Sequence, residues 1–168
     1  MPYILITILF LVVIYQDFKD RAVWWVVFPL AAAAAVWSAS STRYYEVWWM
    51  ESLINSLFLA VQFMVLTLYF SIKFRKPVWI FDEFIGWGDV LFLFVLALLL
   101  SPVNFILFYW SSIIFTLVIA AVYLNKRNKN IPLAGIQAAL FLVILAGDQF
   151  LQNISLTSDH WFLAVVSR

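Results

Sequence analysis

Apolar and polar positions divide the chain into six long apolar runs separated by short polar segments. A run of about 20 apolar residues is long enough for a helix to cross the hydrocarbon core of a bilayer. We therefore predict an all-α, polytopic membrane protein with about six transmembrane helices. The predicted spans are residues 2–16, 22–39, 47–72, 84–101, 103–124 and 131–151.

Turn signals and charges set the limits of these runs. The sequence Ser-Pro-Val-Asn at 101–104 predicts a tight hairpin, because the stretch 90–124 is too long for one crossing. The first run has no small-residue cleavage site after it, so we interpret it as a retained span and not a signal peptide. We predict two parts, a six-helix membrane domain at 1–151 and a short C-terminal tail at 152–168 on the outer face.

The basic residues predict the orientation of the chain. Eight of them follow the first, third and fifth spans: Lys19, Arg21, Lys73, Arg75, Lys76, Lys126, Arg127 and Lys129. Only Arg43 and Arg168 fall on the other side. The positive-inside rule then puts the N-terminus outside and these three loops in the cytoplasm, in a multi-pass protein of the cell's inner membrane. Five tryptophans fall near predicted span ends, where indole rings favour the interface: Trp24, Trp25, Trp48, Trp49 and Trp79.

Composition excludes several classes of function. Of 168 residues, 66% are apolar and 11% charged, whereas a soluble domain carries about 25% charged residues. The net charge of +1 gives no dense basic face for nucleic acid. With no cysteine and one histidine, His160, the chain offers no disulfide, thiolate zinc site, cysteine nucleophile or histidine metal cluster. We expect no metal and no cofactor, and the sequence leaves the oligomeric state open.

Ionisable residues at membrane depth are costly, so each acid needs a reason. We interpret four acids near the outer face as interfacial solubilising groups: Glu46, Glu51, Asp148 and Asp159. Asp82 and Glu83 lie beside the basic residues of the second cytoplasmic loop, where a solvated charge cluster is expected, and like Asp20 they are candidates for attracting a basic peptide.

Asp17 and Asp89 remain, both at the predicted cytoplasmic ends of spans. Their similar depth permits the two carboxyls to meet. Gly86 and Gly88 stand next to Asp89, where missing side chains allow close approach of another backbone. No histidine within the spans completes a serine triad, and no phosphate-binding or dinucleotide motif is present. Of the catalytic groups considered, only the pair of aspartates remains as a candidate.

Three patches resemble the type IV prepilin peptidases. These aspartic membrane proteases include archaeal preflagellin peptidases and share a GxGD motif with presenilin-like enzymes. Residues 17–23 (DFKDRAV) resemble D-x-x-x-R-x-[IV] after the first span, residues 86–89 (GWGD) match GxGD, and residues 131–135 (IPLAG) resemble the Ile-Pro entry to the last span. The resemblance implies a GxGD-type helical bundle with Asp17 and Asp89 as catalytic residues. The supporting motif residues are Arg21, Gly86, Gly88, Ile131 and Pro132.

The resemblance also implies a substrate and a mechanism. The expected partners are the lipid bilayer and a prepilin or pseudopilin, of the type IV pilus or type II secretion kind, cut after a glycine between its basic leader and its apolar helix. Two carboxyls held close do not both ionise, so one activates water while the other keeps a proton. The residues do not assign these two roles. Lacking cysteines and a cytoplasmic insert, the chain resembles a compact peptidase-only form.

The chain departs from the family pattern at three places. Trp24 and Trp25 replace Pro-Asn or Pro-Asp after the first motif, Leu91 stands where a lysine often occurs, and Gly135 replaces the second proline of the third patch. Two alternatives stay open. A catalytically weak or inactive pilin-binding scaffold would tolerate loss of either aspartate, and a small proton or cation transporter would carry acids near mid-membrane in broken helices.

Overall fold

The computed structural model describes residues 2–42, 44–83, 85–123, 133–151 and 156–159. Every regular element in these residues is a helix, which confirms the predicted all-α class. The elements are α1 (Pro2–Asp20), α2 (Val27–Thr42), α3 (Tyr45–Phe74), α4 (Ile80–Glu83), α5 (Trp87–Leu99), α6 (Pro102–Tyr123) and α7 (Leu133–Leu151).

Each of the six predicted runs corresponds to one long helix. The predicted tight hairpin is confirmed, because α5 ends at Leu99 and α6 begins at Pro102. The single-turn helix α4 was not predicted, since its segment reads as a charged loop. Its Ile80 side chain is fully buried, and the Phe81 ring lies 5.4 Å from the Phe63 ring. Packing against α3 therefore orders a turn that the local sequence does not specify.

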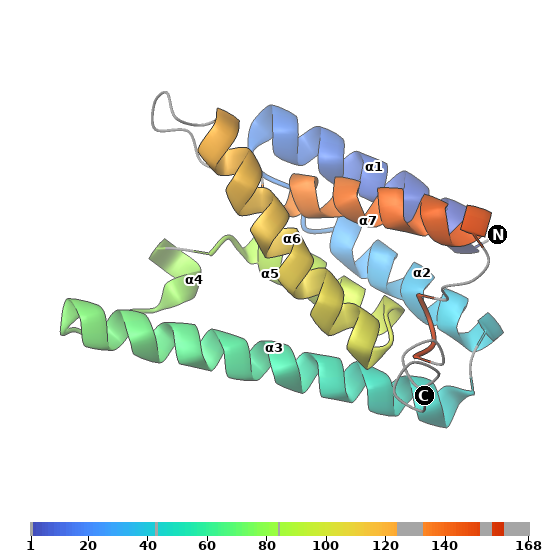
Figure 1. Ribbon diagram of the computed structural model, residues 1–168, viewed down its shortest axis with the longest axis horizontal. Coiled ribbons are helices and arrows are strands. Elements are labelled where there is room, and N and C mark those ends of the chain that lie inside the picture. Colours follow the sequence, from blue (N-terminus) through green and yellow to red (C-terminus); the bar gives the residue numbers. More distant parts are fainter. Residues whose placement is uncertain (1, 43, 84, 124–132, 152–155, 160–168) are drawn as a thin grey trace.

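Consecutive long helices run in alternating directions, and α1 lies beside α7 (Figure 1). Helix α5 packs against α2, α3, α6 and α7, so it is the centre of the bundle. The C-terminal ends of α1, α3 and α6 and the N-terminal ends of α2, α5 and α7 lie at one end of the molecule. We call this the aspartate-pair end, because it carries Asp17 and Asp89, and we call the opposite end, which carries residues 156–159, the tail end.

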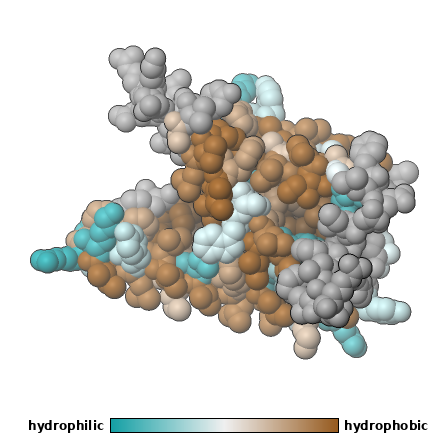
Figure 2. Space-filling view, viewed as in Figure 1, coloured by the Kyte–Doolittle hydropathy of each residue, from teal (hydrophilic) through white to brown (hydrophobic). Residues whose placement is uncertain are grey.

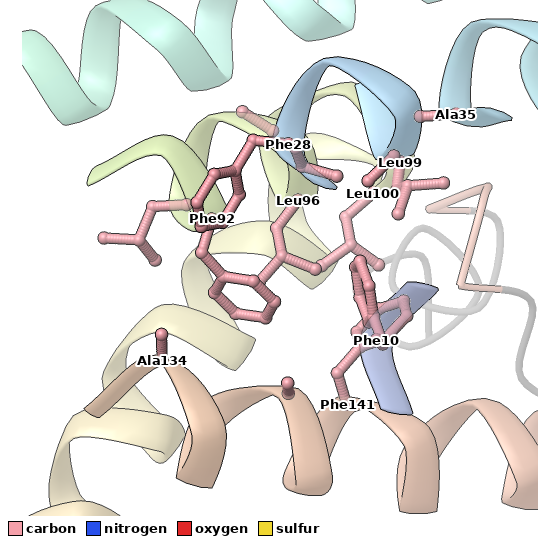
Figure 3. Close-up of a cluster of buried hydrophobic side chains, with 14 of the residues drawn as sticks. Phe10, Phe28, Ala35, Phe92, Leu96, Leu99, Leu100, Ala134 and Phe141 are labelled. Atoms are coloured by element: carbon pink, nitrogen blue, oxygen red, sulfur yellow. The ribbon is translucent and has the colours of Figure 1, made fainter. Parts of the chain in front are cut away.

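The core is built from aromatic side chains of α1, α5 and α7. Phe10 of α1 lies with its ring 5.2 Å from Phe92 of α5 and 5.3 Å from Phe141 of α7 (Figure 3). All three rings are buried. Tilted and edge-to-face arrangements of this kind stabilise aromatic contacts beyond the area they bury. They fix how the three helices pack and hence where the ends of these helices lie.

Two helices contain segments long and apolar enough to cross a membrane, Tyr45–Phe74 and Pro102–Ile119. Only 17% of the most apolar window of α3 is buried inside the protein, and 33% of that of α6. The core helix of a water-soluble protein would be mostly covered. These two helices support a membrane location.

Helix α3 has polar residues on its buried face and apolar residues on its exposed face, which is the reverse of a helix at the surface of a soluble protein. Its buried face carries Trp48, Ser52, Asn55, Leu59 and Phe63 at helical spacing, so two of the five inward residues are polar. Its outward face is mostly apolar, with side chains such as Leu57 and Leu68 exposed, and brown apolar side chains cover much of the surface in Figure 2. A surface of this kind suits lipid and not water.

The tail end is closed by side chains that satisfy helix termini. Helix α5 has 13 residues, about 20 Å, which is shorter than a bilayer core of about 30 Å. Its last carbonyls are met by donors from α3: Asn55 Nδ2 lies 3.0 Å from Ala97 O and 2.9 Å from Leu100 O, and Trp48 Nε1 lies 2.9 Å from Leu98 O. Trp48 is buried within the bundle, and its predicted place near the membrane interface stays a prediction.

Asp159 also has a structural contact at the tail end. Ser101 Oγ donates to its Oδ1 at 2.6 Å and Val103 N donates to its Oδ2 at 3.3 Å, which caps the N-terminus of α6. Asn104 Nδ2 donates to Leu156 O at 3.2 Å and so holds the same segment. Asp159 is thus a helix cap and not, as predicted, a solubilising group, because folding brings the tail back onto the hairpin.

Candidate active site

Asp17 is buried because it continues the inward face of α1. Ile6, Phe10, Val13 and Asp17 follow one another at helical spacing, and each is at most 7% exposed. Asp20, three residues later, is exposed. The helical period alone therefore separates the two aspartates of the first motif and turns only Asp17 toward the bundle.

The first turn of α7 meets Asp17. Gly135 N donates a hydrogen bond to Asp17 Oδ2 at 2.6 Å, across 118 residues of sequence. The first N–H groups of a helix have no partner within the helix, and the helix dipole makes this end positive. The N-terminus of α7 is therefore a natural partner for a carboxylate.

Asp89 lies in the first turn of α5, whose N-cap residue is Gly86. The backbone N–H groups of Ala134 and Gly86 lie close enough to its carboxyl to stabilise the charged form. The Asp17 carboxyl is near enough to interact electrostatically with that of Asp89. The structure therefore brings the two predicted residues to the first turn of α7, where the Gly135 N–H is bonded to Asp17 and the Ala134 N–H lies near the Asp89 carboxyl.

The two motif glycines have different surroundings. A Cβ atom on Gly86 would lie 3.3 Å from Asp89 Oδ2, which is a tight contact with the carboxyl itself. A Cβ on Gly88 would meet only the ring of Phe28, at 3.8 Å, which is an ordinary contact. Close approach of backbone to carboxyl thus requires glycine at 86 more than at 88.

Arg21 follows α1 in the left-handed conformation, with φ 55°, and its N–H donates to Asp17 O at 3.2 Å. Nearby, Trp24 N donates to Gln16 Oε1 at 2.9 Å, which holds the connection between α1 and α2. The exposed Arg21 side chain interacts electrostatically with Asp17. The first motif therefore supplies a helix end and a positive charge as well as an acid.

Asp17 lies one residue beyond the predicted end of the first span, in a mixed electrostatic environment. Burial raises the pKa of its carboxyl above the ordinary value, while the Gly135 amide and the Arg21 charge act in the opposite direction. Burial has the largest effect. A carboxyl of this kind takes up a proton more readily than an exposed aspartate.

Other predicted positions lie apart from the pair or outside the described residues. Ile131 and Pro132, the basic residues of the third predicted cytoplasmic loop, and His160 are not among the described residues. Leu91 and Trp24, two of the departures from the family pattern, are exposed. Within the described part of the chain, no three histidine or acidic side chains come together as a metal site.

Sequence reasoning missed the part played by Ala134, Gly135 and Gln16. Gly135 and Ala134 belong to the third patch, whose resemblance predicted a position near the active site, but their contribution is a backbone N–H that no side-chain pattern specifies. Gln16 carried no signal beyond its place next to Asp17.

No protein-family model, curated protein or solved structure significantly matches this chain. The resemblance of the three patches to prepilin peptidases therefore stays a prediction. The geometry of the two aspartates comes from the structure and does not depend on that resemblance.

Proposed function

We propose that this chain is a membrane-embedded aspartic endopeptidase, which removes the short basic leader of prepilin- or pseudopilin-like proteins at the cytoplasmic membrane boundary. The observation that carries this proposal is the convergence of Asp17 and Asp89 at the first turn of α7. Two acids from helices far apart in the sequence approach the same turn there, in a bundle whose remaining core is largely apolar.

Mutual repulsion favours a state in which the pair holds one proton. In the proposed reaction the ionised carboxyl takes a proton from water as the water oxygen bonds to the scissile carbonyl carbon. The protonated carboxyl donates a hydrogen bond to the carbonyl oxygen, which stabilises the negative charge that develops there. The C–N bond then breaks, and a proton from the pair passes to the leaving amine, which restores the starting state.

The proposed depth of the pair suits a substrate whose apolar helix lies in the membrane. The proposed topology has six spans, with the N-terminus outside and the aspartate-pair end at the cytoplasmic face. Lys19, Lys73 and Arg75 are exposed at this same end, in agreement with the positive-inside rule. A substrate whose leader is in the cytoplasm and whose helix is in lipid has its junction at this depth.

The test is cleavage of a membrane-inserted reporter with a basic leader, a glycine at the junction and an apolar helix. Wild type, Asp17→Asn and Asp89→Asn are compared at equal membrane abundance. Removal of the leader by wild type and by neither variant is the expected result, because an amide can serve neither as base nor as acid. Asp20→Asn is a further comparison, since Asp20 is exposed on the same helix end and its loss tests attraction of the basic leader and not the chemistry of the pair.

The same experiment separates the alternatives. A pilin-binding scaffold would retain the reporter at the membrane without cutting it, in wild type and variants alike. Cutting that survives both substitutions, or no cutting of any prepilin-like reporter by wild type, would contradict the proposed peptidase.

A further inference from the structure

Gly135 occupies an unusual place in α7. It is the third residue of the helix, so its N–H has no acceptor within the helix, and that N–H is directed at Asp17 Oδ2 at 2.6 Å. Gly135 and Asp17 are both buried, so water does not compete freely for this bond. A hydrogen bond to a charged acceptor in such a place is short and strong.

The absence of a side chain is what allows the approach. A Cβ atom on Gly135 would lie 3.0 Å from Asp17 Oδ2 and 3.0 Å from two ring atoms of Phe18. These distances are shorter than ordinary van der Waals contacts, so any larger residue displaces the carboxyl or the ring. By contrast, a Cβ on Gly147, near the other end of α7, meets nothing within 4 Å.

Proline at position 135 would carry no N–H and would add a ring at the same place. Gly135 therefore supplies both features that matter for Asp17, the donor and the space.

We propose that Gly135 is a positioning residue, which holds the Asp17 carboxylate through its backbone N–H and, with the neighbouring Ala134 N–H near Asp89, sets the separation of the two carboxyls. This inference rests on the proposed peptidase function. In this arrangement the first turn of α7 is a clamp of two successive amides, one for each carboxyl.

The charged groups that act on Asp17 within the described residues are Arg21, after its own helix, and Asp89 of α5. A test of the clamp must leave both unchanged. Gly135→Ala keeps the N–H and adds the Cβ, whereas Gly135→Pro removes the N–H and adds a ring in its place. The first turn of a helix tolerates proline, because its N–H groups make no bond within the helix. The difference between the two variants therefore reports on the replacement of the donor by the ring.

The first readout does not depend on activity. Dicyclohexylcarbodiimide, an apolar reagent that attacks protonated carboxyls, is applied over a range of pH to the purified full-length protein. Mass spectrometry of the peptide containing Asp17 then gives the pH of half-maximal labelling. A lost N–H donor destabilises the carboxylate, so Gly135→Pro should label at a pH higher than Gly135→Ala by about one unit. Gly147→Ala should label as wild type does, and Asp17→Asn provides the blank.

The second readout is cleavage of the leader reporter. We expect a roughly tenfold lower rate for Gly135→Ala and a roughly hundredfold lower rate for Gly135→Pro, with Gly147→Ala within about twofold of wild type. Equal thermal unfolding midpoints for the two Gly135 variants show that the comparison is made between equally folded proteins.

The two readouts fail separately. Equal half-labelling pH in Gly135→Ala and Gly135→Pro would overturn the clamp, even where cleavage by wild type still requires both aspartates. A labelling shift together with no cleavage by wild type would support the clamp and contradict the peptidase.

Discussion

The two ends of the bundle hold carboxylates in opposite ways. At the tail end, both oxygens of Asp159 accept hydrogen bonds from fixed donors, Ser101 Oγ and Val103 N, and the acid joins the tail to α6. At the aspartate-pair end, Asp17 and Asp89 approach the same helix turn and repel one another. A carboxylate with both oxygens paired stabilises a fold, whereas two neighbouring carboxyls favour holding one exchangeable proton, which is the arrangement that acid–base chemistry uses.

Helix α5 belongs to both ends and shows the same contrast along 13 residues. Its last carbonyls are bonded to Asn55 and Trp48 of α3, which anchors that end. Its first turn presents Asp89 to another charged group. Rigid anchoring at one end allows the other end to keep an electrostatically unfavourable pair in register.

Replacing one carboxyl at each end by its amide should give the largest contrast. Asp89→Asn should lower the rate of leader cleavage about 10³-fold without lowering the thermal unfolding midpoint, since it removes a charge repulsion. Asp159→Asn should leave the rate within about twofold and lower the free energy of unfolding by about 1 kcal/mol, because a helix cap is weakened. Initial rates and thermal unfolding in the same detergent check both. An equal loss of activity in both variants would contradict the proposal that the aspartate-pair end is catalytic and the tail end structural.

Asn55→Leu should show how firmly the tail end is anchored. The variant leaves two buried carbonyls of α5, Ala97 O and Leu100 O, without their donor, so we expect a loss of about 2 kcal/mol in the free energy of unfolding. Ser56→Ala is the matched control, because the Ser56 hydroxyl bonds to Ser52 O within its own helix. A change in Asn55→Leu no larger than that of the control would contradict the anchoring role.

The pH dependence of cleavage should report on the aspartate-pair end alone. Burial raises the pKa of the Asp17 carboxyl, so on acidification the pair takes up its second proton above the usual range of an exposed aspartate. Below that point the base is lost, and the rate should fall about tenfold per pH unit. Rate profiles of wild type and Asp159→Asn should coincide. A wild-type rate that stays constant down to the ordinary aspartate range would contradict this prediction.

Adding one methyl group at each end of α7 should give the smallest effect. Gly147→Ala adds a side chain in open space and replaces glycine within a helix, so it should raise the free energy of unfolding by about 0.5–1 kcal/mol. Gly135→Ala makes the same change against Asp17 and Phe18 and should not stabilise the protein. Thermal unfolding of the two variants measures the difference, and equal gains would show that Gly135 is not under a packing constraint.

Much of the fold could be predicted because each apolar run is about 20 residues long. One or two misjudged residues within such a run do not change the prediction of a helix. Six helices formed where six runs were predicted, and the hairpin at Pro102 lay where proline and polar residues indicated it. The burial of Asp17 was available from its spacing after Ile6, Phe10 and Val13. The cap formed by Asp159 and the ordered turn at Ile80 were not available, because each depends on a partner from another part of the chain.

The sequence by itself determined which residues are helical, which acids fall near helix ends, and that the outward surface is apolar, because these follow from helical periodicity and from the length of each apolar run. Only the tertiary structure decided that Asp17 and Asp89 meet, and that the meeting point is the first turn of α7. The physical reason is that the partners at that point are backbone N–H groups of Gly135 and Ala134, which every sequence possesses and which only helix packing can direct at a carboxyl.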